Sequence, residues 1–417
     1  MTGPDGDILA QVRAVFGPRP PQRLGVAVSG GGDSMALLHL LSRCFEPETV
    51  SLFCASIDHG LRPEAATEAR LVADLAHRLN IPHATLRWSG WDGSGNLQDQ
   101  ARKARHRLLA DWAGSQQIGT VALGHTMDDQ AETLLLRLAR SAGVDGLQAM
   151  PVRRSMQGLT LVRPLLGLRR TRLRSYLRDQ GIQWAEDPSN DDARFDRIRM
   201  RAALQSLAPL GLTAEALSGV AQNMQRAADA LDHCTARAGR ELARIDGGDL
   251  VIEAQGFHAL PGEIARRLLV HAITWIGGAA YPPRRGALLA ALAAARSGRS
   301  ATLGGCLVLS DRQAVRVCRE FAAVRSLRVP ADEAWDRRWR LQGKPAAGMD
   351  LAALGEKGLA QCPDWRATGR PRAALLASPA LWLGTELVAA PMAGRAQGWH
   401  IRLLPGSDPF ILSLLSH

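Results

Sequence analysis

The sequence predicts an α/β fold in which a parallel-sheet domain is followed by a mostly helical middle domain and a small mixed α+β C-terminal region. Three observations predict it. Short apolar runs alternate with helix-like segments up to about residue 205, and such alternation is typical of βαβ units with a parallel sheet. The first apolar run ends in three consecutive glycines. Beyond residue 205, alanine-rich segments with helical spacing replace the alternation.

The elements of the first half follow from the spacing of the apolar residues. Runs of strand-like length cover residues 24–28, 50–57, 83–87 and 118–123. Predicted helices cover residues 34–43, 64–79, 97–112 and 128–140. In the second of these helices, Leu71, Leu75 and Leu79 form one apolar stripe. We therefore expect a first domain over residues 1–205.

The second half contains fewer strand-like runs. One long helical stretch, with at most one break, covers residues 213–242, and further helices are predicted over residues 263–275 and 285–296. Turns and charges over residues 330–345 favour a linker, and short strand-like pieces follow at residues 381–384 and 387–389. The expected boundaries are a middle domain over 206–328 and a C-terminal region over 329–417.

Charge and cysteine content limit the classes of function. The 417 residues carry a formal net charge of +11, which indicates either a nucleic-acid partner or a general bias toward arginine, since only three of the basic residues are lysines. The six cysteines form no C-x-x-C pair, so we expect free thiols in a reducing cytoplasm rather than a zinc or iron–sulfur site. Neither a signal peptide nor a membrane span is expected.

The segment Ser29-Gly30-Gly31-Gly32-Asp33-Ser34 joins the first predicted strand to a helix. Glycines let a backbone approach a phosphate closely, and N–H groups at a helix N-terminus attract anions. The segment lacks the lysine of a Walker A motif. Its carboxylate, Asp33, suits a magnesium ion that bridges protein and phosphate. A plain strand-to-helix turn is the alternative interpretation.

A second cluster, Gly124 to Thr133, follows the fourth predicted strand. If the helix begins near Thr126, Asp129 and Glu132 lie three residues apart and share a helix face. His125 lies directly before this helix. Two such carboxylates suit a cationic amine or a metal. The alternative is that acids at a helix N-terminus simply complement the helix dipole.

Taken together, these motifs resemble the tRNA(Ile)-lysidine synthases of the PP-loop ATP-pyrophosphatase superfamily. The resemblance spans roughly residues 24–205 and keeps the motif order. Its segments are Ser29–Ser34, Asp58–Arg62, residues 100–105, Gly124–Thr133, Gly143–Leu147, Arg163–Leu166, Asp187–Asn190 and Arg197–Arg199. Just before the last segment, Asp196 stands where the family usually has asparagine. The tail after residue 330 resembles the family only loosely.

The resemblance implies that ATP adenylates the wobble cytidine of tRNA(Ile) with a CAU anticodon, and that L-lysine then displaces AMP. It implies a catalytic PP-loop domain, a tRNA-binding middle domain and a cytoplasmic enzyme, and a homodimer is compatible with it. The expected catalytic residues are Asp33, Arg105, His125, Asp129 and Glu132. ATP is expected on Ser29, Gly30, Gly31, Gly32, Asp33, Ser34, His59 and Arg62, and Mg²⁺ on Asp33 and Asp129.

Arginines are the expected contacts to tRNA. Eight arginines and no acid lie between Pro151 and Arg178, and phosphate contacts of this kind give affinity with little sequence choice. The expected tRNA-binding residues are Arg163, Arg169, Arg170, Arg197 and Arg199. A solvated basic surface is the alternative. For the whole chain, the alternatives are another PP-loop enzyme, such as a tRNA thiolation enzyme or an amide-forming synthetase, and a non-catalytic RNA-binding protein.

Overall fold

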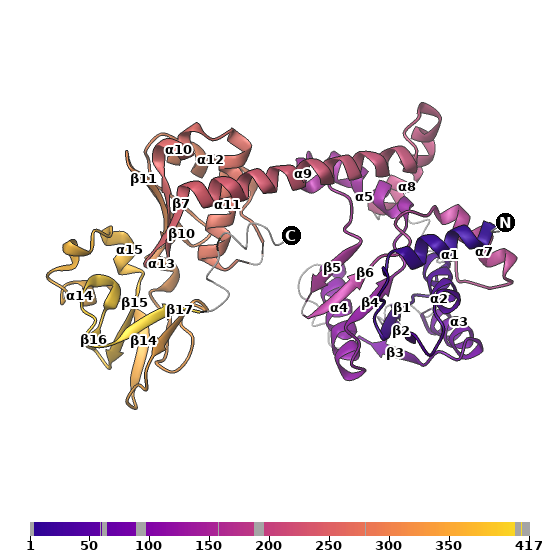
Figure 1. Ribbon diagram of the computed structural model, residues 1–417, viewed down its shortest axis with the longest axis horizontal. Coiled ribbons are helices and arrows are strands. Elements are labelled where there is room, and N and C mark those ends of the chain that lie inside the picture. The colour runs from indigo at the N-terminus through magenta and orange to yellow at the C-terminus, as the bar shows by residue number, and fades with distance from the viewer. Residues whose placement is uncertain are drawn as a thin grey trace. The chain divides into compact units, whose positions relative to one another are not determined.

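The computed structural model describes residues 4–58, 60, 65–88, 97–156, 158–186, 196–279, 281–404 and 410. The chain divides into two compact units, Met1–Ala228 and Asp229–His417, whose elements are labelled in Figure 1. Within the described part of the chain, no helix combines the length and apolarity that a membrane crossing requires.

A six-stranded sheet forms the centre of the first unit, in the order β3-β2-β1-β4-β6-β5. Neighbouring strands are parallel except for the edge pair β5 and β6. The strands are β1 (Arg23–Ala27), β2 (Ser51–Asp58), β3 (His83–Arg87), β4 (Thr120–Leu123), β5 (Arg153–Met156) and β6 (Leu159–Val162). The parallel sheet predicted from the sequence is confirmed.

Helices cover both faces of this sheet, because successive strand residues point in opposite directions. In β4, Ala122 packs in one apolar cluster with α2, whereas Val121 and Leu123 pack in another with Trp112 of α4. The helices are α1 (Pro4–Ala14), α2 (Gly32–Cys44), α3 (Ala65–Arg78), α4 (Leu97–Ser115), α5 (Met127–Ala139), α6 (Val144–Leu147), α7 (Arg170–Asp179) and α8 (Asp196–Leu207), with a 3₁₀ turn η2 (Ala208–Leu210).

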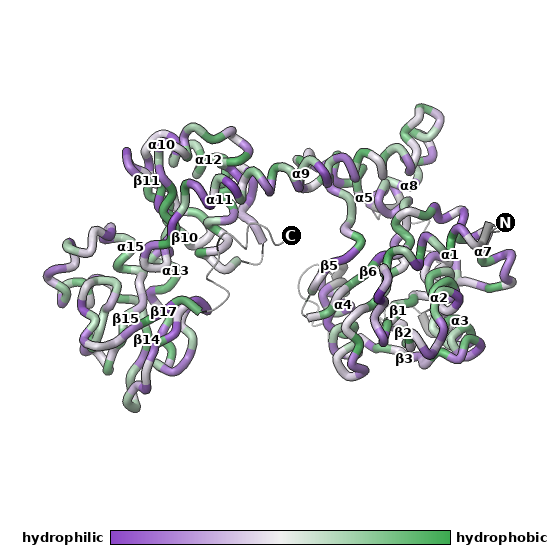
Figure 2. The backbone as a smooth tube through the Cα atoms, viewed as in Figure 1, coloured by the Kyte–Doolittle hydropathy of each residue, from purple (hydrophilic) through white to green (hydrophobic). Residues whose placement is uncertain are grey.

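Helix α9 (Ala214–Leu242) begins in the first unit and ends in the second. It is one continuous helix, without the break that the sequence allowed. Hydrophilic and hydrophobic residues alternate along it, as Figure 2 shows. At its start, Leu217 and Ala221 pack against Ala131 and Leu134 of α5, so the apolar stripe of α9 holds its first turns on the first unit.

The second unit begins with a five-stranded antiparallel sheet in the order β7-β8-β11-β10-β9. Its strands are β7 (Ala243–Asp246), β8 (Asp249–Glu253), β9 (Ala301–Leu303), β10 (Cys306–Ser310) and β11 (Ala314–Arg319). Helices α10 (Ala254–Ala259), α11 (Gly262–Gly277) and α12 (Arg285–Arg296) share an apolar core with it. The predicted helices are confirmed, but the sequence analysis did not predict this sheet.

The C-terminal region combines short strands and helices, as predicted. Strands β12 (Arg328–Pro330), β14 (Met349–Ala353), β15 (Pro379–Leu383) and β16 (Glu386–Ala389) form an antiparallel sheet, and β13 (Trp339–Gln342) pairs with β17 (His400–Leu403). The short helices are α13 (Phe321–Val324), α14 (Gly355–Leu359) and α15 (Arg372–Leu376), with 3₁₀ turns η3 (Trp365–Thr368) and η4 (Pro391–Ala393).

The predicted linker over residues 330–345 is wrong. Trp335 is completely buried, and its indole N–H donates to the carbonyl oxygen of Leu327 at 3.0 Å. Trp339 is also buried and lies in β13. Both rings belong to the core of the C-terminal region, so this segment contributes packing to the fold.

Trp335→Ala should destabilise this region by about 3–5 kcal/mol, because it removes a fully buried aromatic ring and leaves a cavity. Hydrogen exchange measured by mass spectrometry should show faster exchange across residues 327–342. Arg340→Ala is the matched control, since Arg340 is exposed on β13, and it should leave exchange nearly unchanged. Equal exchange in both variants would restore the linker interpretation.

Candidate active site

A pocket of about 260 Å³ lies where β1 and β4 end. In open α/β sheets this edge is the usual place for a ligand. Eight of the predicted catalytic and ATP-binding residues line the pocket: Ser29, Gly31, Gly32, Asp33, Ser34, Arg105, His125 and Asp129. The structure therefore brings together the two motifs that the sequence analysis singled out.

The glycine loop is held in shape by its own hydroxyl groups. The Ser34 hydroxyl donates to the Gly31 carbonyl oxygen at 2.9 Å, and it accepts from the Ser29 backbone N–H at 3.1 Å. Gly30 has a φ of +86°, which disfavours any residue with a side chain. A Cβ at Gly31 would meet nothing closer than 3.7 Å, so the loop is open on the side where helix α2 begins.

The segment after Ile182 closes one side of this loop. The Ala185 backbone N–H donates to the Gly30 carbonyl oxygen at 2.9 Å, and Gly31 and Ala185 form a parallel bridge. The Trp184 ring lies beside Gly32, 3.4 Å from where a Cβ would stand. Trp184 also packs against the apolar core under α2. The ring is therefore held between the glycine loop and this core.

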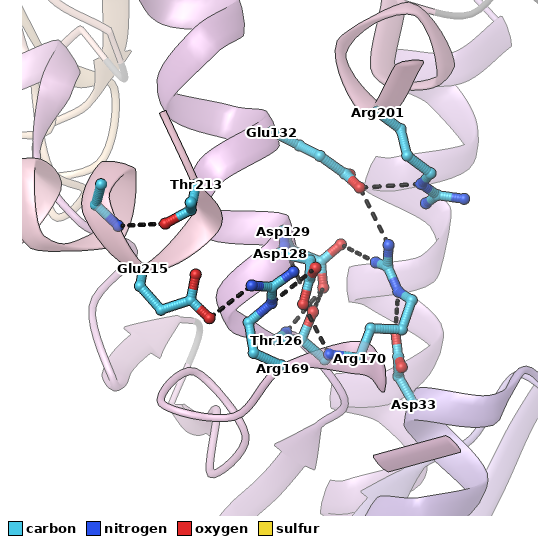
Figure 3. A network of polar contacts seen from close by, with 11 residues as sticks. Asp33, Thr126, Asp128, Asp129, Glu132, Arg169, Arg170, Arg201, Thr213 and Glu215 are labelled. Atoms are coloured by element: carbon cyan, nitrogen blue, oxygen red, sulfur yellow. Dashed lines mark hydrogen bonds and ion pairs between the residues drawn. The ribbon is translucent and has the colours of Figure 1, made fainter. Parts of the chain in front are cut away.

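Three predicted catalytic carboxylates converge on one arginine, as Figure 3 shows. Arg170 donates from Nε to Asp33 at 2.8 Å, from Nη1 to Glu132 at 3.1 Å and from Nη2 to Asp129 at 3.1 Å. Glu132 is almost completely buried and also accepts from Arg201 at 3.1 Å. The cluster therefore joins α2, α5, α7 and α8.

Asp129 also has a local role at the start of α5. Its Oδ2 accepts from the Thr126 backbone N–H at 2.8 Å and from the Thr126 hydroxyl at 3.0 Å, and the Thr126 hydroxyl accepts from the Asp129 N–H at 3.4 Å. This reciprocal pair is a capping box. The helix-terminus interpretation of this acid therefore holds alongside its place in the pocket.

Burial and charge act in opposite directions on the cluster. Burial raises the pKa of Asp33 above its usual value, although the Arg170 guanidinium lowers it in part. For Arg170, burial lowers the pKa but the carboxylates of Asp33 and Asp129 raise it by more, so its net shift is upward. A guanidinium is protonated at any physiological pH. The cluster therefore has a permanent positive charge among its carboxylates.

The predicted tRNA-binding arginines lie in different settings. The Arg163 side chain is buried and donates to the Pro151 carbonyl oxygen at 2.7 Å. Arg169 pairs with Asp128 and with Glu215 of α9. Arg199 is exposed and pairs with Asp196. Three predicted residues, His59, Arg62 and the Arg197 side chain, lie outside the described part of the structure.

Sequence reasoning missed several polar residues of the site, among them two arginines and one acid. Arg201 and Arg174 line the pocket, and Asp128 accepts from the Arg170 backbone N–H at 2.7 Å. Arg170 was expected on tRNA, whereas its guanidinium faces the carboxylates. One signal was available for Arg201, because it follows Arg197 by one helical turn and so shares its face. No local feature of the sequence indicates that Arg170 bonds to the carboxylates of α2 and α5.

Comparisons with known proteins agree with this geometry. Residues 4–208 match the model of the PP-loop domain family. A tRNA(Ile)-lysidine synthase from Ruegeria pomeroyi is 58% identical and covers 99% of this chain and 98% of its own length. The enzyme of the same name from Wolbachia pipientis wMel is 36% identical over 80% of each chain, and that from Methylobacterium nodulans is 42% identical over 70% of this chain and 89% of its own. The chain has a parallel sheet with a glycine loop at the pocket, and a relative 58% identical matches nearly its whole length. The chain therefore belongs to the tRNA(Ile)-lysidine synthase family.

Proposed function

We propose that this chain ligates L-lysine to C2 of the wobble cytidine of tRNA(Ile) with a CAU anticodon. ATP first adenylates the cytidine O2 and releases pyrophosphate, and the lysine ε-amine then attacks C2 and releases AMP. One observation carries the proposal: the open glycine loop and the carboxylate cluster border the same pocket. We assign an anion site to the loop and an ammonium site to the carboxylates, and the two proposed sites would then be neighbours.

The glycine loop is the proposed site for the ATP phosphates. Backbone N–H groups of the loop and the first turn of α2 offer partial positive charge, and the dipole of a helix N-terminus favours an anion. Arg105 and Arg174 line the same pocket and add positive charge. We assign pyrophosphate to Ser29–Ser34 and give Arg105 the α-phosphate or the cytidine base.

Magnesium fits the pocket at one atom in particular. The Asp33 Oδ1 is buried and, among the described residues, has no hydrogen-bond partner. Carboxylate oxygens are the ligands that Mg²⁺ prefers, together with phosphates, and the ion would neutralise phosphate charge. Asp33 is therefore the first candidate ligand. Asp129, the second, uses one oxygen for Thr126 and the other for Arg170, so it would have to release one of them.

Asp129 and Glu132 are the proposed anchors for the lysine side chain. A free lysine ammonium has a pKa of about 10.4, so its amine has to lose a proton before it attacks. A carboxylate of the cluster or His125, which lines the pocket, is the proposed acceptor. Low dielectric around Glu132, which is almost completely buried, strengthens such a charge interaction.

The partner tRNA is assigned by charge and by family. The net charge of +11 suits a polyanion, and the arginines named in the sequence analysis, other than Arg170, remain the proposed contacts. All six cysteines are free thiols, which agrees with a cytoplasmic reaction. We also propose domain boundaries at residues 205 and 328, and a homodimer.

Another PP-loop activity is the main competitor. A thiolation enzyme generally needs catalytic cysteines beside the nucleotide, and no cysteine is among the described residues that line the pocket. A non-catalytic RNA-binding protein would have no need for three buried or half-buried carboxylates at the loop. Both observations favour the ligase.

The decisive assay follows pyrophosphate release from ATP with L-lysine and a CAU-anticodon tRNA(Ile). Turnover should require all three substrates, because adenylation and lysine attack belong to one cycle. Ornithine is the matched control for lysine, since it is one methylene shorter. Release that is unaffected when lysine is omitted from multiple-turnover reactions would contradict the proposal.

Asp33→Ala should lower the rate of adenylation by about 100-fold or more, since it removes a charged group aimed at the phosphates. ATP–pyrophosphate exchange in the presence of tRNA measures this step. Asp7→Ala is the control, because Asp7 is an exposed acid that pairs with Arg172. Retained exchange in Asp33→Ala would reject the metal and phosphate role.

Gly124→Ala should weaken ATP binding by about tenfold, because a Cβ there would lie 3.0 Å from the Ser34 Cα and 3.1 Å from its N, and backbone cannot yield cheaply. The KM for ATP reports the effect. Gly114→Ala is the matched control on α4, where a Cβ meets nothing within 4 Å. Equal KM values in the two variants would show that the loop has room to shift.

A further inference from the structure

Arg170 is held at both ends. It is the first residue of α7, and its backbone N–H donates to the Asp128 carboxylate at 2.7 Å. Its guanidinium donates to Asp33, Asp129 and Glu132, as Figure 3 shows. Only 16% of the side chain is exposed. Such a side chain has little freedom to reach an RNA surface, so its charge is used inside the pocket.

The oxygens that Arg170 occupies are those that an incoming cation would need. Both Asp129 oxygens are engaged, one by Arg170 and one by the capping box. The Glu132 Oε1 accepts from Arg170 and from Arg201. Asp33 gives Oδ2 to Arg170 and keeps Oδ1 buried without a partner among the described residues. Arg170 thus leaves the Asp33 Oδ1, which lies at the loop, available to another ligand.

The guanidinium also sets the charge of the cluster. Without it, three carboxylates from two helices would lie together, and Arg201, which pairs with Glu132, would be the neighbouring cation. Mutual repulsion would then drive the carboxylates apart or favour capture of a cation from solution. A planar guanidinium with several fixed donors can hold carboxylates from different elements at once.

We infer that Arg170 is a positioning residue: it serves as the resident counter-cation of Asp33, Asp129 and Glu132, fixes their orientation, and keeps a free divalent cation out of the nucleotide-free pocket. The inference rests on the proposed function only for its catalytic consequence. It replaces the expected tRNA contact for this arginine with a role that acts through the carboxylates.

The experiment compares wild type, Arg170→Gln, Arg170→Lys and Arg172→Gln. Electron paramagnetic resonance measures Mn²⁺ binding to each protein without ATP, tRNA or lysine, and circular dichroism and a thermal melt check that each is folded. Arg170→Gln should bind Mn²⁺ at least about tenfold more tightly than wild type, because the carboxylates lose a neighbouring positive charge. Arg172→Gln alters another arginine of α7, which pairs with Asp7 of α1, and it should match wild type.

Arg170→Lys separates charge from orientation. A lysine keeps the positive charge but presents a compact ammonium instead of the planar fork, so Mn²⁺ binding should stay within about threefold of wild type. The kcat for pyrophosphate release should nevertheless fall by about tenfold or more, since misplaced catalytic groups are costly. If Arg170→Gln does not fold, Arg170→Lys decides alone.

Two results would overturn the inference. One is Mn²⁺ binding by folded Arg170→Gln that is no tighter than in wild type, and the other is an unchanged kcat in Arg170→Lys. The metal titration uses no substrate of the proposed reaction. If wild type shows no lysine-dependent turnover, the proposed function fails while the Mn²⁺ comparison still decides the role of Arg170.

Discussion

The guanidinium of Arg170 bonds to carboxylates that belong to α2 and α5, and its backbone N–H bonds to a further carboxylate of α5. These contacts tie the start of α7 to the two helices that follow β1 and β4. Charges that are partly withdrawn from water are costly unless each has a partner. The positions of the three helix starts are therefore interdependent, and the pocket keeps its outline only while the charges remain balanced.

The sheet provides the frame on which this balance is built. Because β1 and β4 are adjacent and parallel, the turns that follow them meet at one edge. Gly124 has no side chain, which lets β4 end close to the backbone of Ser34. The glycine loop and the acidic helix terminus thereby become neighbours, because one strand leads into each of them.

Much of this arrangement could be predicted from sequence because it depends on local pattern. The parallel strands, the glycine loop between the first strand and its helix, and the shared face of Asp129 and Glu132 all follow from residue type and spacing along the chain. The partner of those carboxylates could not be predicted, since Arg170 lies about 40 residues further on in a run of similar arginines. Arg170 and Arg169 have different partners only because α7 packs beside α2, which puts Arg170 next to Asp33.

The second unit contains features that could not be predicted from the sequence. Strands β7 to β11 are three to six residues long, so alternation over so few positions gives a weak signal. The segment around Trp335 reads as polar and turn-rich, yet its tryptophans are buried by strands distant in sequence. Burial of this kind is decided by tertiary contacts, which local composition does not encode.

The capping box at the start of α5 limits which substitutions residue 126 can accept. Thr126 and Asp129 cap the helix N-terminus through reciprocal hydrogen bonds, and Asp129 also accepts a hydrogen bond from Arg170. Serine in place of Thr126 would preserve the hydroxyl acceptor, whereas valine, of nearly the same shape, would abolish it. Tolerance at residue 126 is therefore set by hydrogen-bonding capacity rather than by volume, although the side chain is entirely buried. A hydroxyl that is not part of the pocket lining thus limits which residues position 126 can accept.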